Sequence, residues 1–320
     1  MQTVQLGNTN IQVSRLCLGG NVFGWTIDEK NSFEILDAFT EAGFNFIDTA
    51  DVYSRWASGV GGESETIIGK WMKTRGNRNN IVLATKVGMD MGQGKVDVSK
   101  KYIMKAIEAS LKRLQTDYID LYQTHKDDEA TPVEEALQAY NELMKQGKVR
   151  CIGASNFSPH RLKASLKASE EKGLPRYQTL QPLYNLYDRE PYEKELEKIC
   201  VDNNISVITY YSLAAGFLTG KYRSQEDLKK SVRGAKAAGY LNERGFKILK
   251  ALEEVSQRHK VSYSSVSIAW LLSKPSVTAP IASATNLYQL KDLVVGVNLK
   301  LSEDDLNALN MASEWRIKGE

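Results

Sequence analysis

Residues 28–53 read DEKNSFEILDAFTEAGFNFIDTADVY, a helical pattern that leads into a short apolar run and then into polar residues. Asp28 is typical of a helix N-cap and Gly43 of a C-cap, which predicts one helix between them. The apolar run at 44–47 is too short for a helix and predicts a buried strand. The stretch therefore contains a helix and a strand in succession, as in α/β folds.

The same alternation continues to about residue 290, with short apolar runs followed by amphipathic stretches. Eight strands are predicted, at residues 16–18, 44–47, 81–84, 119–123, 150–153, 179–181, 207–209 and 279–281. Further helices are predicted to follow Gly62, Ser99, Pro132, Pro159, Pro191 and Asn242. Each predicted strand is thus followed by a helix.

The strands are almost continuously apolar, which is typical of a parallel sheet covered on both faces. Eight strand–helix units that close on themselves form a (β/α)8 TIM barrel, which we predict as a single α/β domain over residues 1–320. The alternative is an open doubly wound sheet. That fold carries G-x-G-x-x-G after its first strand, whereas this chain has Leu18-Gly19-Gly20-Asn21-Val22-Phe23-Gly24 there and no Walker motif.

Three further segments lie outside the regular repeat. Alternating residues at 4–6 and 11–13 around Gly7-Asn8 predict an N-terminal β-hairpin. Residues 302–313 predict an extra C-terminal helix capped by Ser302. The long segment at 214–241, rich in glycine and basic residues, is typical of a functional loop.

Composition narrows the functional class. The 320 residues are 42% hydrophobic and 25% charged, which is typical of a folded globular chain. A net charge of +3 is too small to favour nucleic acid or an anionic membrane as the main partner. No long apolar segment or signal peptide is visible, so we expect a cytoplasmic protein. The three cysteines and three histidines lie far apart, so we expect no disulfide framework and no metal site.

Four chemically distinctive residues follow consecutive predicted strands. Asp48 and Tyr53 follow the second strand, Lys86 the third and His125 the fourth. Each alone has an ordinary explanation, such as turn capping for Asp48 or surface packing for Tyr53. In barrels of this type, however, chemistry takes place at the carboxyl ends of the strands. Their joint occurrence there predicts a catalytic site.

These four residues form a coherent proton-donating set. A phenol is a weak acid, and we expect the Lys86 ammonium to lower the pKa of Tyr53. Asp48 would keep that ammonium charged and directed. A neutral His125 can donate a hydrogen bond to a carbonyl oxygen. The set therefore predicts protonation of an oxygen that becomes negative, as in carbonyl reduction.

The next strand ends predict a site for the reductant. Ser155, Asn156 and Gln181 supply a hydroxyl and two amides, which suit a carboxamide. Tyr210 offers a flat face for an aromatic ring. Together they predict a nicotinamide ring held over the proton-donating residues.

At these residues the sequence resembles the aldo-keto reductase superfamily, and the resemblance covers essentially the whole chain. The matching segments are residues 46–53, 84–86, 120–125, 153–157, 216–222 and 268–272. The resemblance implies reduction of aldehydes or ketones, sugar-derived ones included, with NADP(H) as hydride carrier. It implies Tyr53 as proton donor and His125 as the residue that orients the carbonyl. Lys86 with Asp48 would tune the donor.

The resemblance also implies further cofactor and substrate contacts. Beyond the nicotinamide site, the implied cofactor residues are Leu213, Gly216, Lys221, Arg223, Ser283, Thr285 and Gln289. Thr285 stands where the family usually has an arginine for the 2′-phosphate, so NAD(H) stays possible unless Lys221 or Arg223 substitutes. Trp25, Trp56 and Met89 are the expected substrate contacts, with the two tryptophans forming an aromatic lip.

Two other functions stay open at this level. Lys86 could form a Schiff base in a lyase, although pairing with Asp48 disfavours the unprotonated amine that this chemistry needs. The chain could also be a non-catalytic redox-sensing subunit that binds the cofactor and attaches to a larger partner. The expected partner is a small carbonyl compound. The oligomeric state stays open, and a monomer is compatible with the sequence.

Overall fold

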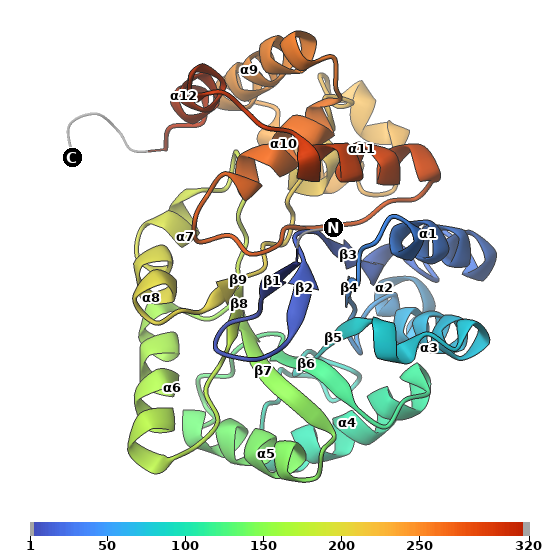
Figure 1. Cartoon of the computed structure of the whole chain (residues 1–320), viewed down its shortest axis with the longest axis vertical. Helices are drawn as coiled ribbons and strands as arrows, with labels where there is room; N and C mark the ends of the chain where they lie inside the picture. Colours follow the sequence, from blue (N-terminus) through green and yellow to red (C-terminus); the bar gives the residue numbers. More distant parts are fainter. Residues whose placement is uncertain (1–2, 316–320) are drawn as a thin grey trace.

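Eight parallel strands form the centre of the computed structural model, which describes residues 3–315 (Figure 1). Their order in the sheet is β10-β3-β4-β5-β6-β7-β8-β9. The bounds are β3 Cys17–Gly19, β4 Phe46–Asp48, β5 Val82–Val87, β6 Ile119–Thr124, β7 Val149–Ser155, β8 Thr179–Gln181, β9 Ser206–Val207 and β10 Ile281–Ala282. All eight predicted strands are confirmed, with ends that shift by up to three residues.

The sheet closes into a barrel between β9 and β10, the two strands at the ends of the sheet order. The carbonyl oxygen of Val207 accepts hydrogen bonds from the backbone N–H groups of Thr278 at 2.9 Å and Ala279 at 3.3 Å. The carbonyl oxygen of Thr209 accepts one from Ile281 at 2.8 Å. The predicted (β/α)8 barrel is therefore confirmed.

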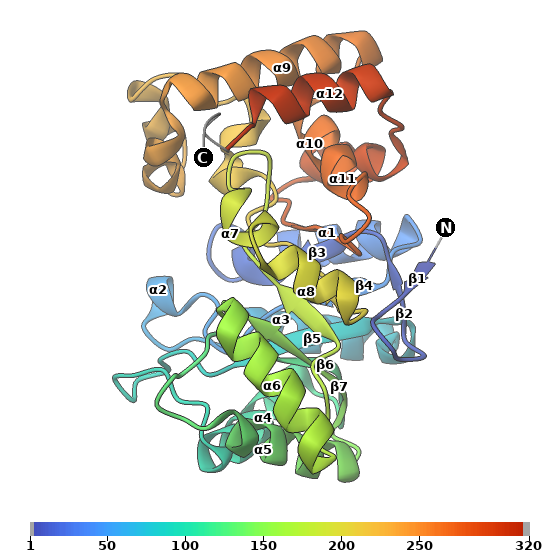
Figure 2. The ribbon, with the colours of Figure 1, turned by 90° about the vertical axis from the view of Figure 1, so that its left-hand side faces the viewer.

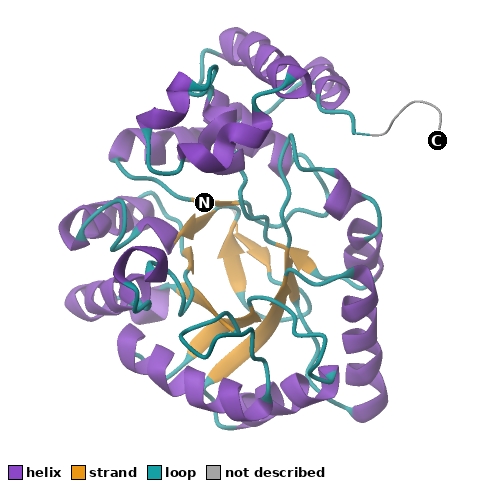
Figure 3. Cartoon of the chain, turned by 180° about the vertical axis from the view of Figure 1, so that it is seen from behind, coloured by secondary structure: helices purple, strands orange, loops and turns teal. Residues whose placement is uncertain are grey.

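Helices surround the strands (Figure 3). The first, α1 (Glu29–Glu41), begins after Asp28, whose side chain accepts a hydrogen bond from the Asn31 backbone at 2.8 Å. The others are α2 Arg55–Ser58, α3 Glu63–Arg75, α4 Lys100–Leu114, α5 Val133–Lys145, α6 Pro159–Lys172, α7 Glu190–Glu193, α8 Leu196–Asp202, α9 Glu243–His259, α10 Tyr263–Leu272, α11 Leu287–Asn298 and α12 Glu303–Ala312. The predicted starting points are confirmed to within a residue or two.

The predicted N-terminal hairpin is present and closes one end of the barrel. Its strands are β1 (Thr3–Gln5) and β2 (Gln12–Ser14), paired antiparallel. Leu6 and Ile11 are buried in a cluster with residues of the barrel interior such as Phe46. Figure 2 shows the hairpin on one side of the barrel, with α2 and the long connections on the other. The carboxyl ends of the strands, where barrels of this type have their sites, lie at that other end.

The long segment at 214–241 is ordered by short helices and buried side chains. It contains three 3₁₀ helices, Ala214–Thr219, Glu226–Lys230 and Gly234–Tyr240. The side chains of Phe217 and Tyr222 are fully buried. The segment therefore forms a packed wall beside the strand ends.

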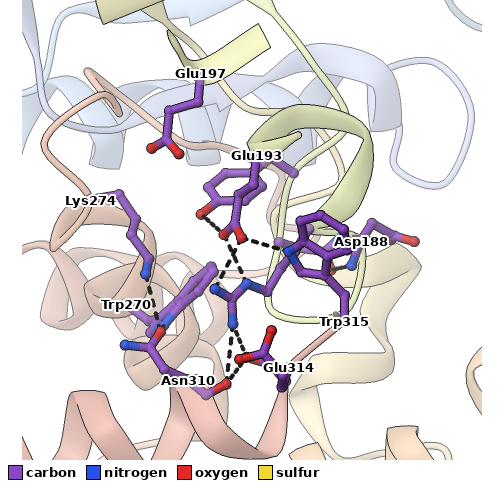
Figure 4. A network of polar contacts seen from close by, with 12 residues as sticks. Asp188, Glu193, Glu197, Trp270, Lys274, Asn310, Glu314 and Trp315 are labelled. Carbon is purple, nitrogen blue, oxygen red and sulfur yellow. Dashed lines mark hydrogen bonds and ion pairs between the residues drawn. The ribbon is translucent and has the colours of Figure 1, made fainter. Parts of the chain in front are cut away.

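A polar network attaches Trp315 and α12 to α7 and α10 (Figure 4). The indole N–H of Trp315 donates to Glu193 Oε2 on α7 at 2.8 Å, and Arg189 Nε donates to Glu193 Oε1 at 2.8 Å. Trp270 Nε1 of α10 donates to Asn310 Oδ1 of α12 at 2.9 Å.

Among residues 3–315, no helix is long and apolar enough to cross a membrane.

Asp305 joins the predicted C-terminal helix to α9. Its carboxylate accepts hydrogen bonds from His259 Nε2 at 2.7 Å, Arg258 Nη2 at 2.6 Å and the Ser302 backbone at 3.0 Å. Burial opposes ionisation, but the hydrogen bonds from His259, Ser302 and Arg258 hold the pKa of Asp305 well below its usual range. The ionised carboxylate therefore stabilises the docked helix.

We expect Asp305→Ala to lower the free energy of unfolding by about 1–3 kcal/mol near neutral pH, as for loss of a cap and charged hydrogen bonds. Because the folded pKa is depressed, this stabilisation is present above the unfolded pKa of about 4 and is lost as the pH falls. Urea denaturation of wild type and Asp305→Ala at about pH 7 and about pH 3 measures the loss of stability and its dependence on pH. Asp304→Ala, an exposed neighbour in the same turn, is the control. A wild-type to Asp305→Ala difference that stays constant with pH contradicts the argument.

Candidate active site

A cavity of about 940 Å³ lies at the carboxyl ends of the strands. Among its lining residues are most of those expected from the sequence: Trp25, Asp48, Tyr53, Trp56, Met89, His125, Ser155, Asn156, Gln181, Tyr210, Leu213, Gly216, Lys221, Ser283, Thr285 and Gln289. Lys86 and Arg223 do not line it. The barrel therefore gathers residues that are far apart in the sequence around one space.

Lys86 lies fully buried behind the cavity wall. Its Nζ atom donates to Asp48 Oδ2 at 2.5 Å, to the Thr49 carbonyl oxygen at 2.8 Å and to Tyr53 OH at 2.9 Å. An ammonium group has three N–H donors, so all three are used. Lys86 is therefore held as a cation directed at the phenol.

The pKa values of this group follow from burial and charge together. Burial lowers the pKa of Lys86, but Asp48 and Tyr53 outweigh it and raise the pKa above its usual value. Burial raises the pKa of Tyr53 to about 12, although the Lys86 ammonium acts in the opposite direction. The predicted net lowering for Tyr53 is therefore wrong, because loss of water around the phenolate outweighs the ammonium. Tyr53 is protonated at neutral pH.

His125 lies beside the phenol. The ring centroids of Tyr53 and His125 are 5.9 Å apart in an edge-to-face arrangement. Burial, and then the Lys86 charge, lower the pKa of His125 well below its usual value. Its Nδ1 atom is buried and has no hydrogen-bond partner among residues 3–315. The imidazole is therefore neutral, as predicted.

The residues expected to hold a carboxamide also come together. Asn156 Nδ2 donates to the His125 carbonyl oxygen at 2.9 Å and to Ser155 Oγ at 3.1 Å. Tyr210 OH donates to Asn156 Oδ1 at 2.8 Å, and Ser155 Oγ donates to the Gln181 carbonyl oxygen at 2.9 Å. The side chains hold one another in place at the cavity wall.

Asp48 connects these two groups directly, and it also contacts Gln123, a residue that the sequence analysis missed. Its Oδ1 atom accepts hydrogen bonds from Gln181 Nε2 at 3.0 Å and from Gln123 Nε2 at 3.2 Å. Gln123 is fully buried and does not line the cavity. The available signal was a polar side chain near the carboxyl end of strand β6, two residues before His125.

The match to the aldo/keto reductase family extends over residues 15–314. The chain belongs to the aldo/keto reductase family. It is 35% identical to the uncharacterized oxidoreductase YrpG of Bacillus subtilis, over 97% of this chain and 95% of YrpG. It is 32% identical to the aldo-keto reductase YhdN of the same organism, over 98% and 94%. Norsolorinic acid reductase stcV of Emericella nidulans is 32% identical, over 92% of this chain and 77% of stcV.

In this aldo/keto reductase, two tryptophan rings lie beside the phenol of Tyr53. The rings of Trp25 and Trp56 lie 5.3 Å apart edge to face, and Trp56 lies 6.0 Å from Tyr53. Trp56 belongs to α2, a four-residue helix flanked by left-handed residues at Ser54 and Gly59. Its side chain is half exposed. The two tryptophans therefore form a lip beside the phenol, as the sequence analysis expected.

The segment at 214–241 brings cations into the cavity lining. Besides Lys221, they are Lys230, Arg233 and Lys236, which the sequence analysis did not name. The Nε atom of Arg233 is buried and has no hydrogen-bond partner among residues 3–315, and burial lowers the pKa of Arg233. The basic run in the sequence was the signal, but it did not show which cations face inward.

Three of the expected cofactor residues make hydrogen bonds within the protein. Arg223 Nη2 donates to Tyr263 OH at 3.0 Å, outside the cavity lining. The Thr285 backbone N–H donates to Gln289 Oε1 at 2.9 Å, and both residues line the cavity. The lysine and arginine residues that line the cavity all lie in the loop at 221–236.

Asp51 lies behind the site with an unusual charge state. Its side chain is buried, and its Oδ1 atom has no hydrogen-bond partner among residues 3–315. Burial, with a smaller contribution from Glu65, raises the pKa of Asp51 to about 8, against the effect of Arg113. The carboxyl group is therefore neutral in the folded protein at neutral pH.

We expect Asp51→Asn to change how stability depends on pH. The folded pKa of Asp51 lies above its unfolded value, so the stability contributed by the neutral acid is lost as the pH rises from about 4 to about 8. Relative to Asp51→Asn, wild type should lose about 5 kcal/mol over this window, because each of the roughly four pH units between the two pKa values costs about 1.4 kcal/mol. Urea denaturation across the window measures it, with exposed Asp117→Asn as control. Parallel curves for wild type and Asp51→Asn contradict the assignment.

Proposed function

We propose that this aldo/keto reductase reduces aldehydes or ketones to alcohols, with NADP(H) as hydride carrier and Tyr53 as proton donor. The observation that carries the proposal is the 2.9 Å hydrogen bond from Lys86 Nζ to Tyr53 OH, with Asp48 2.5 Å from the same ammonium. This group opens into a cavity that His125 also lines. Tyr53 lines this cavity and Lys86 does not, so the phenol is the group that can donate a proton to a bound ligand.

The residues divide the reaction between them. His125, neutral and beside the phenol, orients the carbonyl oxygen by a hydrogen bond. A reduced nicotinamide, when bound, supplies the hydride for the carbonyl carbon. Tyr53 OH gives its proton to the carbonyl oxygen. Lys86 then stabilises the phenolate that remains, and Asp48 keeps Lys86 charged.

The lining of the cavity fits such a cofactor. Gln181 is hydrogen-bonded to Asp48, and Tyr210 is hydrogen-bonded to Asn156; both line the cavity and would bind a carboxamide and an aromatic ring there. The loop cations supply counter-charge for a diphosphate and a 2′-phosphate. At Gly216, an added Cβ would lie 3.1 Å from Lys221 Nζ, so glycine lets this ammonium approach the backbone. This concentration of positive charge is the reason to favour NADP(H) over NAD(H).

Tyr53→Phe tests the proton donor. We expect the variant to lower kcat for a reactive aromatic aldehyde by about 10²–10⁴-fold, because only the donated proton is removed. NADPH affinity should stay within about threefold, since the phenol oxygen is not a proposed cofactor contact. The decrease of NADPH absorbance measures turnover, and quenching of protein fluorescence measures binding. Folded wild type that turns over none of several carbonyls contradicts the function, and an active Tyr53→Phe contradicts the donor.

Arg233→Ala tests the charge argument. We expect the NADPH dissociation constant to rise by about 10-fold or more, as for loss of a charge-assisted hydrogen bond, and NADH to be affected less. Arg223→Ala is the matched control, because that guanidinium contacts Tyr263 outside the cavity lining. Equal effects of the two substitutions contradict the role given to Arg233.

The geometry disfavours a Schiff-base lyase. Lys86 is fully buried and uses its three N–H groups in hydrogen bonds, so no lone pair faces the cavity. Borohydride treatment in the presence of carbonyl compounds should therefore leave the mass of Lys86 peptides unchanged. Measured turnover also separates the reductase from a cofactor-binding subunit without catalysis.

A further inference from the structure

A closed ring of hydrogen bonds lies beneath the cavity. Gln123 Nε2 donates to Asp48 Oδ1 at 3.2 Å, and Gln181 Nε2 donates to the same oxygen at 3.0 Å. Gln181 Nε2 also donates to Gln123 Oε1 at 3.2 Å. All three side chains are buried. Gln123 therefore touches both the partner of Lys86 and the amide at the cavity wall, without lining the cavity itself.

The negative charge of Asp48 fixes the orientation of the two glutamine amide groups in this ring. An ionised carboxylate only accepts hydrogen bonds, so both glutamines must present nitrogen to it. Reversal of the Gln181 amide would place its oxygen against the carboxylate. Both N–H groups of Gln181 are thus used, and its Oε1 atom is left as an acceptor. The amide of Gln181 consequently suits the NH₂ group of a carboxamide.

The barrel interior leaves space for Gln123 at one position. Gly153 is its partner in the register of β6 and β7. A Cβ atom added at Gly153 would lie 3.1 Å from Gln123 Cγ and 2.1 Å from Thr179 Oγ1. The glycine therefore allows a long polar side chain to lie inside the barrel at this level.

We propose that Gln123 is a positioning residue for the reaction. It holds Asp48 and Gln181 in one fixed arrangement, so the proton donor and the amide that binds the nicotinamide keep a constant relation. This inference rests on the proposed reductase function. Gln123 acts through Asp48 and Gln181 and touches neither substrate nor cofactor.

Two substitutions separate this role from simple packing. Gln123→Leu keeps a similar volume but removes both hydrogen bonds, and we expect kcat to fall by about 10- to 100-fold with a smaller change in KM. Gln123→Glu restores both bonds while the new acid is protonated, since its O–H can donate to Asp48 and its carbonyl oxygen can accept from Gln181. Its ionised form cannot donate, and it repels Asp48.

The pH profile is therefore the deciding measurement. We expect Gln123→Glu to approach wild-type kcat near about pH 6 and to fall to the Gln123→Leu level as the pH rises to about 9, while wild type changes little. Thr179→Val is the control, because its buried hydroxyl adjoins Gly153 and has no hydrogen-bond partner among residues 3–315. This control should keep the wild-type profile.

The outcomes distinguish this inference from the function on which it rests. If wild type reduces carbonyls and the Gln123→Glu profile runs parallel to it, the role of Gln123 is wrong. A Gln123→Leu variant within about twofold of wild type has the same meaning. If Gln123→Leu fails to fold, the Gln123→Glu profile alone decides. If folded wild type reduces no carbonyl, the proposed function fails, and the role of Gln123 fails with it.

Discussion

The ion pair between Lys86 and Asp48 is the constraint around which the rest of the site is built. Both side chains are buried, and removing two charges from water is costly unless every donor and acceptor finds a partner. The barrel meets this requirement from several strands at once. Asp48 accepts from Lys86 and Tyr53 on one oxygen and from two glutamines on the other. Polar residues inside the barrel are therefore a consequence of the pair.

The two ends of the barrel differ in polarity: one is apolar, and the other holds the buried ion pair and the cavity. The hairpin and the lower barrel residues form an apolar layer that excludes water from below. Cys17 belongs to this layer, and burial together with Asp48 raises the pKa of its thiol, which stays neutral. Above it lies the ion pair, and above the pair the cavity. The ion pair between Lys86 and Asp48 thus lies on the side of the apolar layer that faces the cavity.

The strand ends could be read from the sequence because each element carries a local signal. Short stretches dominated by apolar residues begin β4 to β7, and polar residues such as Asp48, Lys86 and Ser155 stand at or near the carboxyl ends of these strands. The helix α10 gives no such signal, because most of its residues are buried and it lacks an amphipathic pattern. Arg233 could not be chosen among its basic neighbours, since the loop backbone decides which side chains turn inward. Gln123 was missed because its contacts, and the role proposed from them, depend on two partners from other strands.

The pKa of Tyr53 shows why charge alone was an insufficient guide. The sequence places a lysine near a phenol, but only the fold shows how little water remains around the pair. Burial raises the pKa of Tyr53 to about 12 and keeps the proton on the phenol. The same low dielectric strengthens the attraction between the phenolate and the Lys86 ammonium once that proton has left. In the proposed reaction, burial therefore keeps the phenol protonated before proton transfer, and the ammonium stabilises the phenolate after it, so the two effects act at different stages.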